Sequence, residues 1–206
     1  MENHIKRKYR DIFKIINSFL FVWLYIPHLL IYIWGKHRDI INSDLKILRH
    51  QIKISSHIPN WLELLVFLHN SSYFRSLFYY RIGPIASFLI GWWRPKDKTF
   101  ILPYSTKIGK GMWFAHPYST VLNANSIGDN FRCLHCVTIG TKEGMAAKLG
   151  IRPIIGNNVS IACHVCIIGN IKIGDNVTIG AGSVVIKDVP DNCIVAGNPA
   201  KIIKYI

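Results

Sequence analysis

Large aliphatic residues recur every six positions in the C-terminal half of the chain. The series is Ile155, Ile161, Ile167, Ile173, Ile179 and Val185. A helical face repeats about every 3.6 residues and a strand face about every 2, so a period of six fits neither element alone. The period predicts short parallel strands wound into a three-sided β-helix, in which stacked coils cover one another's apolar sides.

The positions between these residues support the same prediction. The fifth position of each hexad is again mostly aliphatic, as in Val159, Val165 and Val177. The second to fourth positions hold Gly, Asp and Asn, which tolerate positive φ and tight corners. We therefore expect positions one and five to point inward and the middle positions to form the corners of the coil.

The repeat extends upstream with one irregularity and one interruption. Ile108, Ile127 and Ile139 begin further hexads, but Val121 arrives one position late. Ile139 and Ile155 are sixteen residues apart, so we expect residues 141–153 to leave the coil as a loop. Long loops on a regular scaffold are often functional, although a tolerated surface insertion explains the spacing equally well.

The first half of the chain has a different pattern and predicts a separate domain. From Ser43 to Trp93 the apolar residues are spaced as in helices, and a charged segment, 96–98, follows Pro95. We predict an N-terminal α-helical domain, residues 1–98, followed by a β-helix domain, residues 99–206.

The segment Ile15–Trp34 is almost wholly apolar and has basic residues on both sides. Its length approaches that of a membrane-spanning helix, but Pro27 would bend or break a straight helix. Three alternatives remain open: a spanning helix, an interfacial or re-entrant anchor, and a buried helix of the assembly.

The formal charge of the chain is +14. Residues 1–100 carry 15 Lys and Arg against six Asp and Glu, which is +9 of that total. Basic residues also alternate with an aromatic set, Tyr73, Phe74, Phe78, Tyr79, Tyr80, Trp92 and Trp93. Basic and aromatic residues together are typical of a membrane interface, and the alternative for this set is a helical core. No helix-turn-helix, zinc-finger or RNA-binding signature accompanies the charge, so a nucleic-acid partner is disfavoured.

Five cysteines without a secretory signal indicate a reducing compartment. We expect a cytoplasmic protein, associated with the inner face of the membrane if its apolar segment contacts lipid. Cys133 and Cys136 have CxxC spacing, as do Cys163 and Cys166, and such pairs can hold zinc. In the hexad register Cys133 points inward and Cys136 lies at a corner, so the four thiols cannot converge and no metal is expected.

Three segments of the second half resemble the serine acetyltransferase family of hexapeptide-repeat acyltransferases. They are Ile108-Gly-Lys-Gly-Met-Trp-Phe-Ala-His116, Val137-Thr-Ile-Gly140, and Ile179-Gly-Ala-Gly-Ser-Val-Val185 together with Val195-Ala-Gly-Asn-Pro-Ala-Lys201. The resemblance covers residues 107–201, close to half the chain. It implies a left-handed parallel β-helix, a homotrimer or a dimer of trimers, and acetyl-CoA as the acetyl donor.

The resemblance places the catalytic base at His116. A neutral imidazole can take the proton of a hydroxyl as its oxygen attacks a thioester, with direct transfer of the acetyl group. His135 stands where the sugar-acetylating branch of the family commonly has histidine. Three alternatives remain open for it: it orients His116, contacts the acceptor or is simply exposed. Arg152, near the end of the predicted loop, is the candidate for binding the acceptor.

Two departures separate this sequence from the serine acetyltransferases it resembles. That family has Asp immediately before the catalytic histidine and an acidic residue further upstream, where this chain has Ala115 and Ile101. Free serine needs an acceptor for its ammonium group, and neither position supplies one. The sequence is closer to the branch that acetylates sugars in capsule and exopolysaccharide pathways, so we expect a sugar acceptor, free or lipid-linked.

Two other functions remain open: a serine O-acetyltransferase of cysteine biosynthesis, and a non-catalytic β-helix that binds CoA or a protein partner. For the donor, small residues let a thin pantetheine arm approach the backbone in a groove between subunits, and cations pair with phosphates. The candidate donor-binding residues are Ala162, Gly180, Ala181, Lys187 and Lys201.

Overall fold

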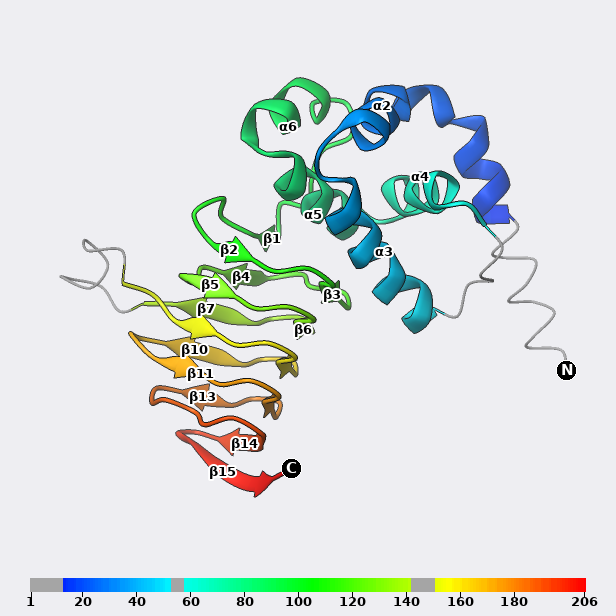
Figure 1. Cartoon of the computed structure of the whole chain (residues 1–206). Coiled ribbons are helices and arrows are strands. Elements are labelled where there is room, and N and C mark those ends of the chain that lie inside the picture. The colour runs from blue at the N-terminus through cyan, green and yellow to red at the C-terminus, as the bar shows by residue number, and fades with distance from the viewer. Residues whose placement is uncertain (1–12, 53–57, 142–150) are drawn as a thin grey trace, which may run out of the picture. The chain divides into compact units, whose positions relative to one another are not determined.

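The chain folds as two compact units (Figure 1). The structure, a computed structural model, describes residues 13–52, 58–141 and 151–206. The first unit, Met1–Lys96, is helical, and the second, Asp97–Ile206, is built from short strands. This division falls two residues before the boundary expected from the sequence at 98/99.

Short turns that contain serine, glycine and proline separate several helices of the first unit. Its helical elements are Phe13–Leu20, the 3₁₀ turn η1 (Val22–Tyr25), α2 (Ile26–Trp34), α3 (Arg38–Ile52), α4 (Asn60–Asn70), α5 (Ser72–Ile82) and α6 (Pro84–Ile90). The Ser71 side chain accepts a hydrogen bond from the Phe74 N–H and caps the start of α5. Gly83, at φ 87°, has a positive φ that favours glycine at the end of α5, and Pro84 starts α6.

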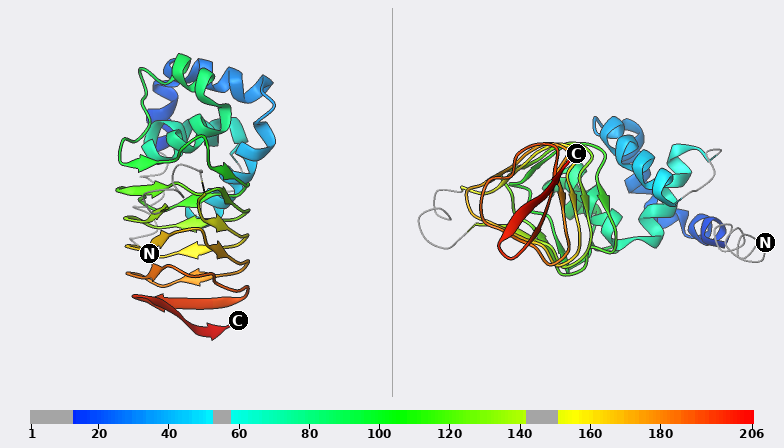
Figure 2. Two further views of the ribbon diagram at one scale, coloured as in Figure 1. Left: turned by 90° about the vertical axis from the view of Figure 1, so that its left-hand side faces the viewer. Right: turned by 90° about the horizontal axis from the view of Figure 1, so that it is seen from below.

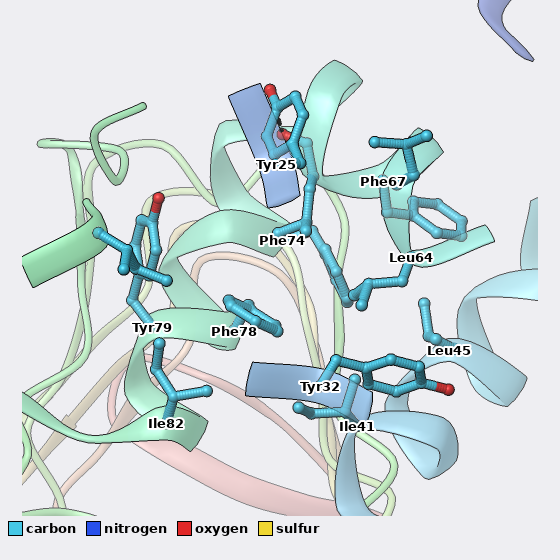
Figure 3. Packing of buried hydrophobic residues seen from close by; sticks show 13 residues of the cluster. Tyr25, Tyr32, Ile41, Leu45, Leu64, Phe67, Phe74, Phe78, Tyr79 and Ile82 are labelled. Carbon is cyan, nitrogen blue, oxygen red and sulfur yellow. Dashed lines mark hydrogen bonds between the residues drawn. The ribbon is translucent and has the colours of Figure 1, made fainter. Parts of the chain in front are cut away.

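Aromatic residues of η1, α2, α4 and α5 form much of the core of the helical unit (Figure 3). Phe74, Phe78 and Tyr79 of α5 are at most 5% exposed. A membrane-interface role is therefore wrong for these three residues, because α5 buries side chains around most of its circumference. Trp92, from the same predicted aromatic set, remains largely exposed.

The apolar segment Ile15–Trp34 is bent. Its parts Phe13–Leu20 and Val22–Trp34 meet at 72°, so the bend lies at Phe21 and not at Pro27. Pro27 lies in the first turn of α2, where proline is compatible with a helix. Among the described helices, none alone is long and apolar enough to cross a membrane, whereas this bent pair together meets that test by length and composition. Tyr25 and Tyr32 point into the core, and other apolar residues of the segment stay exposed.

The second unit is a stack of coils whose three sides are β-sheets (Figures 1 and 2). Its strands are β1 (Phe100–Ile101), β2 (Lys107–Ile108), β3 (Trp113–Phe114), β4 (Thr120–Leu122), β5 (Ser126–Ile127), β6 (Arg132–Cys133), β7 (Thr138–Gly140), β8 (Ile154–Ile155), β9 (Ser160–Ile161), β10 (Cys166–Ile168), β11 (Lys172–Ile173), β12 (Thr178–Ile179), β13 (Val184–Val185), β14 (Cys193–Gly197) and β15 (Ala200–Tyr205). Successive strands enter the three sheets in turn, with orders β1-β4-β7-β10-β13, β2-β5-β8-β11 and β3-β6-β9-β12-β14-β15. All pairs are parallel except β14 and β15, which form a hairpin at the C-terminal end of the stack.

The six-residue repeat lines the inside of these coils, as the sequence predicts. Ile155, Ile161, Ile167, Ile173 and Ile179 are at most 2% exposed. Parallel pairing keeps equivalent positions above one another, so that Ile139 pairs with Ile167 in the next coil. The predicted three-sided parallel β-helix is therefore confirmed in its sheet arrangement and its inward residues.

The irregularity near Val121 is larger than the sequence analysis proposed. Leu122, and not Val121, is the inward residue of β4, because it is fully buried and pairs with Ile139 while Val121 is only half-buried. Phe114 occupies the equivalent position on β3, in register with Cys133. Phe114 and Leu122 are eight residues apart instead of six, so the corner between β3 and β4 contains two extra residues.

The predicted loop leaves the coil between β7 and β8. Strand β7 ends at Gly140 and β8 begins at Ile154. Most of the predicted loop 141–153, namely residues 142–150, lies outside the described residues. The coil continues in register across it, since Ile127 of β5 pairs with Ile155 of β8.

Asparagines and glycines hold the corner that follows the β2-β5-β8-β11 sheet. Its four asparagines have φ of 55–56°, and each of the first three donates from Nδ2 to the next Oδ1 at 2.7–2.9 Å: Asn130, Asn158, Asn176 and Asn192. A Cβ on Gly156 would lie 2.6 Å from the Gly174 carbonyl oxygen, so this spacing of the coils requires glycine. The predicted role of Gly and Asn at corners is confirmed here.

Candidate active site at one corner of the coil

Several chemically active side chains gather at the corner between the β3-β6-β9-β12 sheet and the β4-β7-β10-β13 sheet. We call it the histidine corner; it comprises residues 115–119, 134–137, 162–165 and 180–183. Backbone hydrogen bonds of 3.0–3.1 Å join its successive turns, with Cys136, His164 and Gly182 donating to Tyr118, His135 and Cys163. Residues from four coils, distant in sequence, therefore form one column.

His116 lies in the longest described turn of this column, between β3 and β4. The two extra residues of the coil fall here, and both His116 and Ser119 adopt positive φ, of 51° and 50°. Pro117 between them is buried and anchors the turn, whereas the His116 side chain is exposed. Among the described residues its ring makes no hydrogen bond, to His135 or to any other group. The turn thus presents an imidazole at the surface of the coil.

His135 sits one coil further along the column and belongs to a stack of rings. It lies parallel to Tyr118, with ring centroids 4.9 Å apart and an interplanar angle of 18°. The His164 ring meets His135 edge-on, at 5.5 Å and 86°. His135 is half-buried while Tyr118 is 43% exposed, so the pair offers a flat aromatic surface to a ligand.

The histidine corner carries no carboxylate among its described residues. Three acids lie instead at the corner that follows the β2-β5-β8-β11 sheet, where they accept backbone hydrogen bonds: Asp129, Asp175 and Asp191. Ala115 and Ile101 occupy the two positions where the resemblance implies acids; Ala115 is half-buried, and Ile101 is 49% exposed on β1. An ammonium group on the acetyl acceptor would need an anionic partner, and the described residues of this corner supply none. A neutral hydroxyl compound does not need one.

Arg152 belongs to a different corner. It precedes β8, and its Nη1 donates to the Ser105 hydroxyl at 2.8 Å, in the turn between β1 and β2. Within one chain the structure does not bring Arg152 to the histidine corner. A joint role of Arg152 and His116 in binding one acceptor therefore requires two subunits.

The five candidate donor-binding residues divide into two groups. Ala162, Gly180 and Ala181 lie in the histidine corner, in the coils beyond His135. A Cβ on Gly180 would approach the Ala196 Cβ to 2.9 Å, so Gly180 also serves the packing of β14. The other two, Lys187 after β13 and Lys201 on β15, are exposed and lie outside this corner.

Three members of the site were not assigned to it from the sequence: Tyr118, Cys163 and His164. The available signal was the position within each hexad. His135 and Cys163 both occupy third positions, and Cys136 and His164 both occupy fourth positions, so stacked coils place them on one corner. When each hexad is considered alone, contacts between residues of neighbouring coils are missed.

The six-residue repeat is similar to that of a known class of transferases. Residues 152–187 match the family described as bacterial transferase hexapeptide (six repeats). The match lies within the C-terminal unit and agrees with its three-sheet coil.

Within this class the chain is similar to acetyltransferases of two kinds. Over 104 residues it is 42% identical to serine acetyltransferase 4 of Arabidopsis thaliana, an alignment that covers 50% of this chain and 28% of that protein. Over 98 residues it is 44% identical to the putative colanic acid biosynthesis acetyltransferase WcaB of Escherichia coli K12, covering 46% of this chain and 57% of that protein. The crystal structure of Neisseria gonorrhoeae serine acetyltransferase (CysE) matches with a TM-score of 0.62 at 27% identity, over 84% of this chain and 69% of that one.

These similarities are partial in length. The matched segment makes up 28% and 57% of the two curated relatives, less than two thirds of either. Both sequence alignments span about half of this chain.

Proposed function

We propose that this protein is an acetyl-CoA-dependent O-acetyltransferase that acetylates a sugar hydroxyl in the biosynthesis of a surface polysaccharide. The observation that carries the proposal is the exposed imidazole of His116, held by a lengthened turn in the same column as an aromatic surface and small residues. The similar proteins named above are acetyltransferases, one of serine and one of colanic acid biosynthesis.

In this mechanism His116 acts as a general base. Its neutral imidazole accepts the hydroxyl proton while the hydroxyl oxygen attacks the thioester carbonyl carbon. The carbon–sulfur bond then breaks, and the imidazolium returns the proton to the departing thiolate. The acetyl group passes directly to the sugar oxygen, so no side chain of the protein becomes acetylated.

We place the donor along the histidine corner, in a groove shared by neighbouring subunits of a homotrimer of left-handed coils. Ala162 and Ala181 leave the backbone open to close approach by the pantetheine arm. The exposed Lys187 and Lys201 supply positive charge for its phosphates. Arg152 lies on another corner of its own chain, so in this proposal it binds the acceptor of a neighbouring subunit's His116.

Serine is the alternative acceptor, and similarity alone supports it as well as a sugar, at 42% against 44% identity. The chemistry of the corner favours the sugar. Among the residues that the structure describes, no carboxylate lies at this corner to bind an ammonium group, whereas the Tyr118–His135 pair can pack against the C–H face of a sugar ring.

An acceptor screen tests this function. The full chain is incubated with acetyl-CoA and, in turn, nucleotide sugars, capsular oligosaccharides and L-serine, and release of free CoA thiol is followed. We expect thiol release with a sugar and none above background with L-serine. Turnover of serine that exceeds turnover of every sugar would reverse this choice. A failure to bind acetyl-CoA in calorimetry would favour a non-catalytic β-helix that binds a protein partner.

We further propose that the helical unit contacts the cytoplasmic face of an anionic membrane, where a lipid-linked acceptor would be found. At and just after α6, Ile85, Phe88, Leu89 and Trp92 are between 64% and 82% exposed. Their spacing places them on one side of a helix, as in amphipathic helices that lie in the lipid headgroup region. The +9 charge of residues 1–100 adds attraction to anionic lipid.

Vesicle sedimentation checks this contact. We expect the full chain to bind vesicles that contain phosphatidylglycerol and to bind neutral phosphatidylcholine vesicles less well. Phe88→Glu should weaken binding by about 10-fold or more, because it removes about 1.5–3 kcal/mol of apolar burial and adds a negative charge. Ile203→Glu is the matched control, since Ile203 is 66% exposed but lies on β15. Equal losses in both variants, or a change of oligomeric state in Phe88→Glu alone, would indicate that α6 has another partner.

A further inference from the structure

The histidine corner contains a group of side chains with the geometry of a metal site. His135, Cys163 and His164 each offer one ligand atom, a ring nitrogen or the thiol sulfur, and these atoms all lie within 4.8 Å of one another. Cys163 and His164 are neighbours in one coil, and His135 belongs to the coil before it. The His164 N–H donates to the His135 carbonyl oxygen at 3.1 Å and so sets one turn directly on the other.

Two imidazoles and a thiolate form a ligand set typical of zinc. Zinc bonds nitrogen at about 2.0–2.1 Å and sulfur at about 2.3 Å, which separates tetrahedral ligand atoms by about 3.5 Å. Modest side-chain rotations therefore suffice to close the group around an ion. Magnesium and calcium prefer oxygen ligands, which this group lacks.

We propose that His135, Cys163 and His164 bind a zinc ion whose fourth position is open to water or to an acceptor. His135 and Cys163 are half-buried and His164 is exposed, so an ion can enter from solvent. Packing of the His135 ring on Tyr118 restrains one ligand before the ion arrives. Zinc binding here stands independently of acetyl transfer, since it needs only these three side chains.

The sequence analysis expected no metal, because the two CxxC pairs are out of register. That reasoning excludes a site of four thiols and is consistent with the structure: Cys133 lies inside the coil, where burial raises the pKa of its thiol. It does not exclude a mixed site. In such a site, histidines of two neighbouring coils supply two of the ligands. Of the four cysteines in the CxxC pairs, Cys163 alone belongs to the group.

Cobalt(II) provides a direct test, since it replaces zinc in tetrahedral sites and reports the ligands in its spectrum. The full chain, stripped of metal with a chelator under reducing conditions, is titrated with cobalt(II) alone. We expect a thiolate-to-cobalt charge-transfer band in the near ultraviolet and tetrahedral d–d bands in the visible, both saturating at one ion per chain. Zinc should then displace cobalt, and this competition gives the zinc affinity.

Two cysteine variants identify the ligand. Cys163→Ser should abolish the charge-transfer band and weaken binding by more than the about 10–100-fold loss that follows removal of an outer partner of a metal ligand. Cys166→Ser, the matched control, changes a half-buried cysteine on β10 outside the group and should keep the band. A band lost only in Cys166→Ser would assign the metal to that cysteine, contrary to the proposal. Absence of both bands in the unmodified chain would overturn the proposal without reference to any variant.

Discussion

Replacing His116 by alanine is expected to lower kcat for acetyl transfer by about 10²–10⁴-fold, the contribution typical of a general base. The KM for acetyl-CoA should change little, because the candidate donor-binding residues lie elsewhere in the column or beyond it. Thiol release from acetyl-CoA with the best acceptor of the screen measures both constants.

Backbone conformation is the main alternative cause of such a loss, since His116 has positive φ and alanine is less well suited to it. Ser119→Ala is the matched control. Ser119 lies in the same turn with φ 50°, so its replacement imposes a similar conformational cost and leaves the imidazole in place. We expect this variant to keep most of the activity. Undiminished turnover in His116→Ala would exclude His116 as the base.

Replacing Asp44 by alanine is expected to lower the free energy of unfolding of the helical unit by about 3–5 kcal/mol. Asp44 of α3 accepts two hydrogen bonds from Arg81 of α5, at 2.9 and 3.1 Å, and the two side chains are 1% and 3% exposed. Removal of the carboxylate leaves a guanidinium buried without this anion. Urea unfolding followed by tryptophan fluorescence measures the loss, because five of the six tryptophans lie in this unit.

Two further variants separate burial of the charge from effects of the helix itself. Asp39→Ala makes the same substitution at an exposed position of α3 and should cost no more than about 1 kcal/mol. The double variant Asp44→Leu with Arg81→Met removes both charges and should recover much of the stability, because apolar residues of similar volume can replace a buried ion pair. An Asp44→Ala variant as stable as Asp39→Ala would show that the pair contributes nothing.

The coil is the part of this protein most readily predicted from sequence. Its interior accepts only apolar residues at fixed intervals, and its corners accept only residues that turn tightly, so Ile173 and Asn176 each carry their structural role in their identity and spacing. The irregular spacing near Val121 shows the limit of predicting inward residues from the six-residue period. An insertion of two residues shifts the register, and burial of Leu122 decides how the extra length is absorbed.

The helical unit was predicted less well. Alternation of aromatic and basic residues in α5 is compatible with a membrane interface and with a core, and periodicity does not distinguish them when a helix is buried around most of its surface. Arg81 shows the difficulty most clearly. A basic residue among aromatics looks like an interfacial anchor, yet here it lies in the interior because Asp44, 37 positions away, neutralises it there.

The sequence by itself determined the repeating coil and most of its inward residues, because these depend on spacing within the chain. The candidate base His116 was predicted from the resemblance to serine acetyltransferases. Only the tertiary structure decided which side chains meet. Parallel stacking brings Tyr118, His135 and His164 together from three successive coils, and it leaves Arg152 on another corner. The physical reason is that backbone hydrogen bonds and the length of each turn set the register between coils. A single hexad specifies neither of them.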